Sequence, residues 1–134
     1  MLKQLSIYAE NKKGALQTMT NALYEAGINI WGSVTNDGAE YGINRIVVSD
    51  PDKAKEVLTE RGYLCRFVDV LAVEIEDKPG ALNTLLTALL DSNVNVDYTY
   101  LSFNRDSSTP VMILHTADPE EVEICLKAKG FKMV

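Results

Sequence analysis

The sequence has little of what metal sites, cofactor sites and disulfide scaffolds require. Its 134 residues include one histidine and two cysteines, and Cys65 and Cys125 stand far apart. Structural zinc sites and disulfide frameworks use several cysteines or histidines at characteristic spacings, so neither is expected, and both thiols are expected to be buried. No phosphate-binding or dinucleotide-binding glycine-rich motif is present. We therefore expect neither a metal nor a cofactor.

Long apolar runs and basic clusters are also missing. No apolar stretch approaches the roughly 20 residues of a transmembrane helix, and the first residues lack the apolar core of a signal peptide. Lysine and arginine together number 13 against 19 aspartates and glutamates, a formal net charge of −6. Nucleic-acid binding relies on clustered positive charge. We expect a cytoplasmic protein that binds neither membranes nor nucleic acid.

Catalytic residues are scarce as well. A general base needs an orienting partner and a nucleophile, and the sequence nominates neither for His115. Carboxylate pairs such as Glu120 and Glu121 begin a predicted helix, where attraction to the helix dipole explains them. We expect no enzyme. A small enzyme is the alternative, and a cleft holding His115 beside an acid or thiol would reveal it.

What the sequence does contain is an internal repeat. The stretch ENKKGAL at 10–16 returns as EDKPGAL at 76–82, 66 residues later. The pair Asp50-Pro51 returns as Asp118-Pro119, 68 residues later, and a two-residue insertion near 104–109 accounts for the change because hairpin loops tolerate insertions. The repeat predicts two copies of one small domain, at 1–66 and 67–134.

Each copy predicts the same order of elements. Apolar residues alternate at the start of each copy, which is typical of a strand, and then recur at helical spacing. Gly27 is expected to end the first helix, and each Asp-Pro pair to begin a second one. The helical stripes expected to face the core are Ala15, Leu16, Met19, Ala22, Leu23 and Ala26, and Ala81, Leu82, Leu85, Leu86, Leu89 and Leu90. Further strands are expected at 28–36, 41–49, 63–67, 94–104, 109–116 and 131–134.

The order β-α-β-β-α-β, found twice, predicts an α+β fold. It corresponds to two ferredoxin-like repeats, each an antiparallel sheet with its helices on one face. A copy of about 66 residues would be only marginally stable by itself, because a small domain buries too little of its surface. We therefore expect the copies to pack together and the chain to form a homodimer.

The loop after the first strand of each copy is the strongest candidate site. Asn11 and Gly14 occupy the same positions in the first copy as Asp77 and Gly80 in the second. One interpretation is structural, since glycine permits a tight turn and Asn or Asp caps it. The other is functional, because free N–H groups at a helix start can hold a small carboxylate.

A second pair of polar residues also matches between the copies. Asn29 and Asn95 each stand between branched apolar residues, although asparagine is uncommon in strands. They either cap the bend from helix to strand or contact a ligand or the neighbouring repeat.

These residues give the sequence a resemblance to the ACT domain family of small-molecule regulatory modules. The resemblance rests on the element order, on the Asp-x-Pro-Gly-Ala-Leu stretch at 77–82 and on Gly-Ile-Asn-Ile at 27–30, and it covers nearly the whole chain. The first copy departs from the pattern, with Asn11 in place of the acid and Lys13 in place of the proline.

The resemblance implies a non-catalytic protein that binds a free amino acid where two repeats meet. The ligand would signal by changing how the chain associates with itself or with a partner. The implied binding residues are Asn11, Gly14, Ala15, Leu16 and Asn29 in the first copy and Asp77, Gly80, Ala81, Leu82 and Asn95 in the second. Trp31 and Tyr98 begin the next strands near the same end and could wall the ligand. The alternative is a regulatory subunit that acts mainly through contact with a biosynthetic enzyme.

Overall fold

The computed structural model describes residues 1–10, 12–36 and 41–134. The chain divides into two compact units. The N-terminal unit comprises Lys3–Val68, and the C-terminal unit comprises Asp69–Val134 together with Met1–Leu2. Asn11 and the expected turn residues Asp37 and Gly38 lie outside the described residues. No helix in the described segments is long and apolar enough to cross a membrane.

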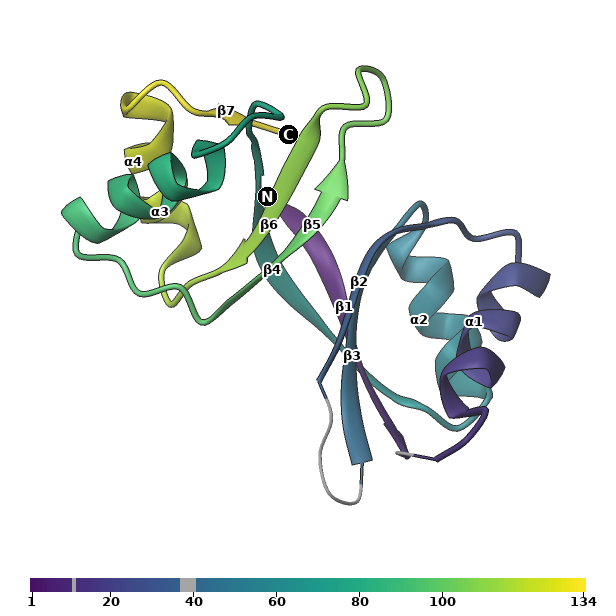
Figure 1. The fold of residues 1–134 in the computed structure, drawn as a ribbon. Helices are drawn as coiled ribbons and strands as arrows, with labels where there is room; N and C mark the ends of the chain where they lie inside the picture. The colour runs from purple at the N-terminus through teal and green to yellow at the C-terminus, as the bar shows by residue number, and fades with distance from the viewer. Residues whose placement is uncertain (11, 37–40) are drawn as a thin grey trace. The chain divides into compact units, whose positions relative to one another are not determined.

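The elements follow the expected order twice, which confirms the α+β fold (Figure 1). Those of the first repeat are β1 (Leu2–Glu10), α1 (Ala15–Glu25), β2 (Ile30–Asn36), β3 (Tyr41–Val48) and α2 (Pro51–Glu60). The strand β4 (Leu64–Glu74) contains all but the first residue of the strand expected at 63–67 and continues into the alternating apolar residues that begin the second repeat. The remaining elements of the second repeat are α3 (Ala81–Asp91), β5 (Tyr98–Phe103), β6 (Pro110–His115), α4 (Pro119–Ala128) and β7 (Lys132–Met133).

The strands pair antiparallel within each unit. In the N-terminal unit β3 pairs with β1 and with β2, and the pairing with β2 shifts register between Ile30 and Gly32. In the C-terminal unit β6 pairs with β5 and with β4, and β4 also pairs with β7. Both helices of a unit lie on the same side of its sheet (Figure 1).

A hydrophobic core fills the space between sheet and helices in each unit. In the N-terminal unit it joins strand residues such as Leu5 and Ile46 to helix residues such as Leu23 and Leu58. In the C-terminal unit the corresponding core residues are Leu71, Leu85, Leu89, Leu114 and Leu126. Cys65 is buried as expected, and burial raises the pKa of its thiol, whereas Cys125 is only half-buried.

The helical stripes are narrower than the sequence predicts. Met19, Ala22 and Leu23 of α1 are buried, as are Leu85 and Leu89 of α3. Other residues expected to face the core are instead exposed: Leu16, Leu82, Leu86 and Leu90. The expectation is wrong for these four because a helix lying on a sheet buries only the central part of its apolar arc. The outer leucines of α3 therefore form an exposed apolar row.

The helix ends agree with expectation except at the start of α4. Gly27 follows α1 with a φ of 72°, and in the second repeat Asn93 occupies the equivalent position with a φ of 57°. The Asp50 side chain accepts a hydrogen bond from the Lys53 amide at 3.1 Å and so caps α2. Asp118 stands at the same place before α4, but its side chain makes no capping bond.

Candidate functional site

The two loops that precede α1 and α3 have the same geometry. Gly14 and Gly80 stand at the N-cap positions with φ angles of 83° and 87°. A Cβ on either glycine would meet no atom within 4 Å, so the positive φ, and not crowding, makes glycine the suitable residue. Each carbonyl accepts two hydrogen bonds, from the amide and the hydroxyl of Thr18 or Thr84 four residues later.

Two backbone N–H groups at each helix start face no acceptor in the described part of the chain. The first amide of each helix donates back into its loop, from Ala15 to the Lys12 carbonyl at 3.1 Å and from Ala81 to the Lys78 carbonyl at 3.2 Å. The next two amides, such as those of Leu82 and Asn83, have no acceptor within the helix. Together with the helix dipole they favour an anion.

A cavity adjoins each loop, and the two cavities are built from equivalent positions. The cavity of the N-terminal unit has a volume of about 440 Å³ and that of the C-terminal unit about 400 Å³. In each unit it is bounded by the end of a strand, the loop and the turn after the second helix. Lining residues of the first include Tyr8, Glu10, Lys12, Gly14, Gly62 and Tyr63. Those of the second include Glu74, Glu76, Lys78, Ala81, Gly130 and Phe131.

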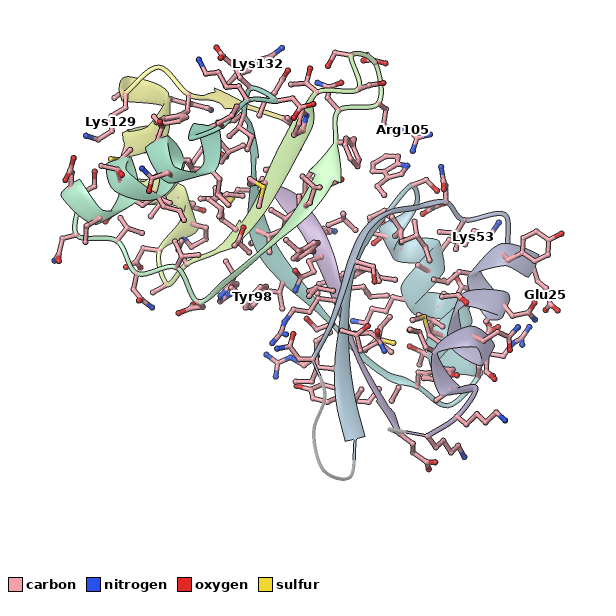
Figure 2. The ribbon with its side chains drawn as sticks, viewed as in Figure 1. Glu25, Lys53, Tyr98, Arg105, Lys129 and Lys132 are labelled. Carbon is pink, nitrogen blue, oxygen red and sulfur yellow. The ribbon has the colours of Figure 1, made fainter. Side chains whose placement is uncertain are left out.

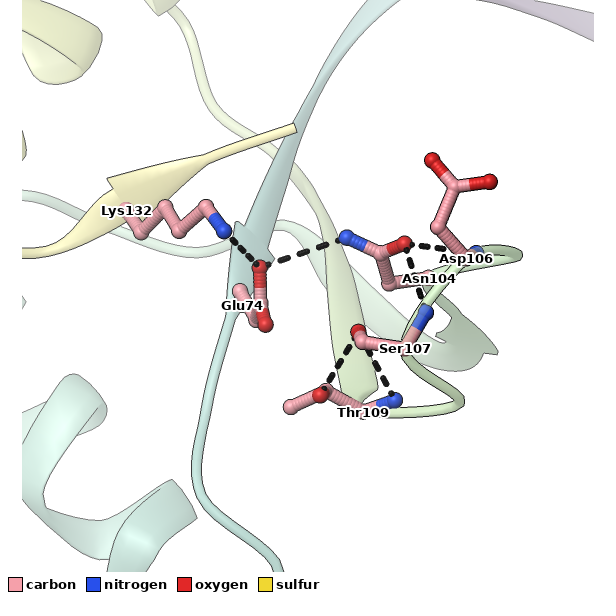
Figure 3. Close-up of polar contacts among 6 residues, drawn as sticks. All are labelled: Glu74, Asn104, Asp106, Ser107, Thr109 and Lys132. Atoms are coloured by element: carbon pink, nitrogen blue, oxygen red, sulfur yellow. Dashed lines mark hydrogen bonds and ion pairs between the residues drawn. The ribbon is translucent and has the colours of Figure 1, made fainter.

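The walls of the two cavities differ in chemistry. Where the first has Tyr8, the second has Glu74, whose carboxylate lies 3.3 Å from the Lys132 ammonium and accepts from the Asn104 amide at 3.4 Å (Figure 3). Desolvation raises the pKa of Glu74. The hydrogen bond and the charge of Lys132 lower it, as do hydrogen bonds from Thr109 and Asn104. Together these contacts outweigh desolvation, so the pKa lies below its usual value. Asn104 also accepts from the Asp106 and Ser107 amides, which fixes the turn that leads to Thr109 in the cavity wall (Figure 3).

Each loop also carries an ion pair between residues two positions apart. Glu10 lies 2.8 Å from Lys12, and Glu76 lies 2.5 Å from Lys78. The hydrogen bond from Lys12 lowers the pKa of Glu10, and the same bond raises the pKa of Lys12. These pairs are exposed, so they set the local charge of the loop and contribute little to stability.

The structure places most of the expected loop residues at or beside these cavities. Gly14 and Ala15 line the first cavity and Ala81 lines the second. Leu16 lines a smaller neighbouring cavity of about 100 Å³. Gly80 and Leu82 are adjacent to Ala81 in the chain, and Asp77 is exposed on its loop. Asn11 lies outside the described residues.

Asn29 and Asn95 lie at the opposite end of their own units from these loops. Asn29 follows α1, and its amide and carbonyl both bond to Ser49, at 3.0 Å and 2.9 Å. Asn95 follows α3, and its side chain donates to Asp97 at 3.1 Å. An 11-residue helix, roughly 16 Å long, therefore separates each asparagine from the loop of its own repeat.

Trp31 and Tyr98 are also at that opposite end. Because β1 and β2 both run antiparallel to β3, the start of β2 lies beside the start of β1, far from the loop that follows β1. The expectation that these aromatic residues begin near the loop is wrong within each unit. Tyr98 and Lys132 mark the two ends of the C-terminal unit (Figure 2).

His115 contacts an acid but no candidate nucleophile. Its Nδ1 lies 2.8 Å from the Asp97 carboxylate, and its ring stacks on Tyr98 with centroids 4.9 Å apart. Among the described residues no serine, threonine or cysteine is hydrogen bonded to His115, and no cluster of three ligating side chains could hold a metal. The contacts with Asp97 and Tyr98 hold the orientation of the imidazole at the end of β6.

Sequence reasoning missed the cavity walls contributed by distant segments. Tyr63 and Phe131 follow the second helix of each repeat and reach the loop only through the fold. The available signal was the pair Gly62 and Gly130, which recur 68 residues apart and position these aromatic residues.

Comparison with solved structures gives three informative similarities. Protein BT0572 from Bacteroides thetaiotaomicron is 31% identical, with 99% of this chain and 91% of that chain covered and a TM-score of 0.90. The regulatory subunit of aspartate kinase from Thermus thermophilus, in its ligand-free form, is 16% identical, with coverages of 94% and 88% and a TM-score of 0.68. The corresponding subunit from Thermus flavus is 19% identical, with coverages of 96% and 91% and a TM-score of 0.61.

A search of curated proteins found no match. The family model described as an ACT domain pair matches residues 1–133. Because this match spans nearly the whole chain and each unit has the expected α+β architecture, the chain belongs to the ACT domain pair family.

Proposed function

We propose that this chain is a non-catalytic regulatory protein that binds a free amino acid at the loops preceding α1 and α3. The observation that carries the proposal is a cavity of about 400 Å³ beside a helix start whose amides lack acceptors among the described residues. Membership of the ACT domain pair family supports it, as does the similarity of fold to regulatory subunits of aspartate kinase.

Different groups of the loop bind the two charges of a zwitterionic amino acid. The ligand carboxylate accepts hydrogen bonds from the amides of Leu82 and Asn83, where the helix dipole also favours negative charge. The ligand ammonium pairs with Asp77, whose exposed carboxylate has no ion-pair partner in the described part of the chain. In the first repeat, Gly14, Ala15 and Leu16 supply the same bend, with Asn11 in place of the acid.

Affinity sets a requirement on how closed the site is. Micromolar binding is about −8 kcal/mol, or about −0.8 kcal/mol for each of about ten ligand atoms, below the ceiling of about −1.5 for small ligands. An open loop does not reach this value, so the bound ligand has to be covered by a second surface. We propose that a homodimer supplies that surface and that the ligand favours one association state over another.

Calorimetric titration of the full chain with each standard amino acid tests the proposal. One of them is expected to bind, and Asp77→Asn is expected to weaken binding about tenfold through loss of a charge-assisted hydrogen bond. The matched control is Asp91→Asn, which removes an exposed carboxylate at the far end of α3 and leaves binding unchanged. Absence of binding by every amino acid well above millimolar concentration would contradict the proposal.

A second candidate function is that of a subunit acting mainly through contact with a biosynthetic enzyme. The fold similarity to regulatory subunits of aspartate kinase favours it. The exposed leucines of α3, Leu82, Leu86 and Leu90, favour it as well because an apolar row on the surface marks contact sites. Affinity purification from the source cell should retain an enzyme of amino-acid biosynthesis, and Leu86→Thr, which copies Thr20 of the first repeat, should reduce retention. Equal retention by both proteins would count against this candidate.

A further inference from the structure

The C-terminal unit has a second cavity, away from the loop that precedes α3. Its volume is about 400 Å³, and it is bounded by the connection after α3, the segment after β6 and the first turns of α4. Asn95, Asp97, Thr116, Asp118 and Glu121 contribute its polar wall. Tyr98, the neighbour of Asp97 in sequence, lies at the opposite end of the unit from Lys132, which lines the loop cavity (Figure 2).

The inner wall of this cavity contains an unsatisfied hydroxyl. Thr116 is 2% exposed, and its side-chain oxygen has no hydrogen-bond partner among the described residues. The residue continues the alternation of Met112 and Leu114, which belong to the core, so its side chain is on the helix-facing side of the sheet, where the cavity lies. A buried polar group without a partner is unfavourable and calls for an explanation.

The fold itself does not require this hydroxyl. The equivalent residue of the first repeat is Val48, which is a member of the hydrophobic core. Valine and threonine have nearly the same shape, so valine would fill the position without an unpaired oxygen. A ligand that bonds to the hydroxyl would account for threonine in the second repeat.

The charge of the cavity points to a cation, because Asp97, Asp118 and Glu121 carry three formal negative charges, which exceed the roughly half positive charge at the start of α4. Asp97 is already engaged by Asn95 at 3.1 Å and by His115 at 2.8 Å. Asp118 and Glu121 form no ion pair within the described segments, and no lysine or arginine lines the cavity. The first repeat has Trp31 and Lys53 where the second has Asp97 and Glu121, so this charge is particular to the second repeat (Lys53 is labelled in Figure 2).

An organic ammonium fits these walls better than a metal ion. No group of three histidine, cysteine, aspartate or glutamate side chains in the described residues is placed to hold a metal. Carboxylates and a hydroxyl oxygen accept hydrogen bonds from an ammonium, and Val94 and Val122 offer an apolar surface for carbon atoms. We propose that this cavity binds a small aliphatic amine, with its ammonium between Asp118 and Glu121 and Thr116 accepting a further N–H.

Two-dimensional amide NMR spectra of the full chain, titrated with 1,4-diaminobutane, test this proposal. The signals of Asn95, Thr116 and Glu121 are expected to shift and saturate, whereas butyrate should leave them unchanged. A second titration with an end-blocked peptide that contains one lysine tests whether the cavity instead binds a lysine side chain of another protein. The free amine should bind more tightly than this peptide. The absence of a saturable shift up to about 10 mM, tenfold above a Kd of about 1 mM, would overturn the proposal, as would tighter binding of the peptide.

Two variants separate a built site from general attraction to an acidic protein. Glu121→Lys, which copies Lys53 of the first repeat, should weaken amine binding at least tenfold. The control Glu120→Lys makes the same charge change on the neighbouring residue, which does not line the cavity, and should change binding less than threefold. Equal weakening by both would show only diffuse attraction and would overturn the proposal.

Thr116→Val tests the hydroxyl without changing the shape of the core. It should weaken amine binding severalfold while the melting temperature stays equal or rises, because an unpaired buried oxygen is removed. Unchanged affinity would overturn the role given to Thr116. Amino-acid binding at the other loop is read from the Leu82 and Asn83 signals, so the two proposals fail separately.

Discussion

At the start of α3, the conformation of Gly80 decides where the chain turns into the helix. Its φ of 87° lies in the left-handed region, where a Cβ clashes with the backbone. We expect Gly80→Ala to lower the free energy of unfolding by about 1–2 kcal/mol, measured by urea denaturation. Gly80→Asn should cost less, because asparagine tolerates the left-handed region.

Neighbouring side chains offer no competing explanation for that cost. A Cβ at Gly80 would meet nothing within 4 Å, so the penalty reflects backbone strain alone. If alanine and asparagine destabilised the chain equally, the strain argument would be wrong.

Some residue-scale features could be predicted from the sequence and others could not. Gly27 was recognisable as the end of α1, because glycine adopts positive φ readily. Asn93, at the same position of the second repeat, also has a positive φ but carries no comparably specific signal, since asparagine occurs in many other settings. The role of Asn93 can be recognised only when the two copies are aligned and Asn93 falls opposite Gly27.

At the scale of elements, α2 and α4 begin with the same Asp-Pro pair but differ in their caps. The Asp50 carboxylate accepts from the Lys53 amide at 3.1 Å, whereas Asp118 makes no such bond. Asp50→Ala is therefore expected to lower the free energy of unfolding by about 1 kcal/mol, and Asp118→Ala by only a few tenths. Chemical denaturation of both variants measures the difference, and equal losses would contradict the assignment of the caps.

The helix α3 shows why the burial of an amphipathic element is harder to predict than its existence. Its leucines recur at helical spacing, so the helix itself was predictable. Leu85 and Leu89 are nevertheless buried while Leu82, Leu86 and Leu90 are exposed. Periodicity defines an apolar arc, but the sheet beneath covers only part of that arc, and the sequence does not show which part.

At the scale of the whole molecule, the duplication made the fold predictable and left the candidate site incomplete. Two copies of one pattern fix the element order and the position of each loop. The opposite walls of the cavities come from residues such as Tyr63 and Phe131, which are about 50 positions away in the chain. Antiparallel strand pairing and helix packing bring such segments together, and a local sequence pattern does not show which segments will meet.

The response of the chain to acid belongs to the same scale, because it sums over both units. Among the described residues, four carboxyl groups have a pKa below the usual 4.5, namely those of Glu10, Glu25, Glu74 and Glu123. Most are held there by one cationic partner, as Arg61 holds Glu25 at 2.8 Å. The pKa of Glu123 is lowered most by the hydrogen bond from Lys127 and next by the hydrogen bond from the amino group of Met1.

The direction of the pH effect follows from these lowered pKa values. A carboxyl whose pKa is lower in the folded chain stabilises it at pH values above 4.5, and that contribution disappears as the pH falls through the folded-state pKa. Urea midpoints should therefore decrease as the pH is lowered from about 5 to about 3. Salt should weaken the contributions of Glu10 and Glu25 most, because their ion pairs are exposed.

Glu123→Gln tests one contribution to that acid response. The variant should be less stable than the native chain near neutral pH, and the difference should shrink as the pH falls through the lowered folded-state pKa of Glu123 and the native carboxyl becomes protonated. Glu56→Gln is the control, because Glu56 is an exposed helical glutamate that forms no ion pair among the described residues, and this variant should be about as stable as the native chain near neutral pH. A Glu123→Gln difference that stayed constant from neutral to acidic pH would show that the Lys127 and Met1 contacts do not stabilise the folded chain in solution.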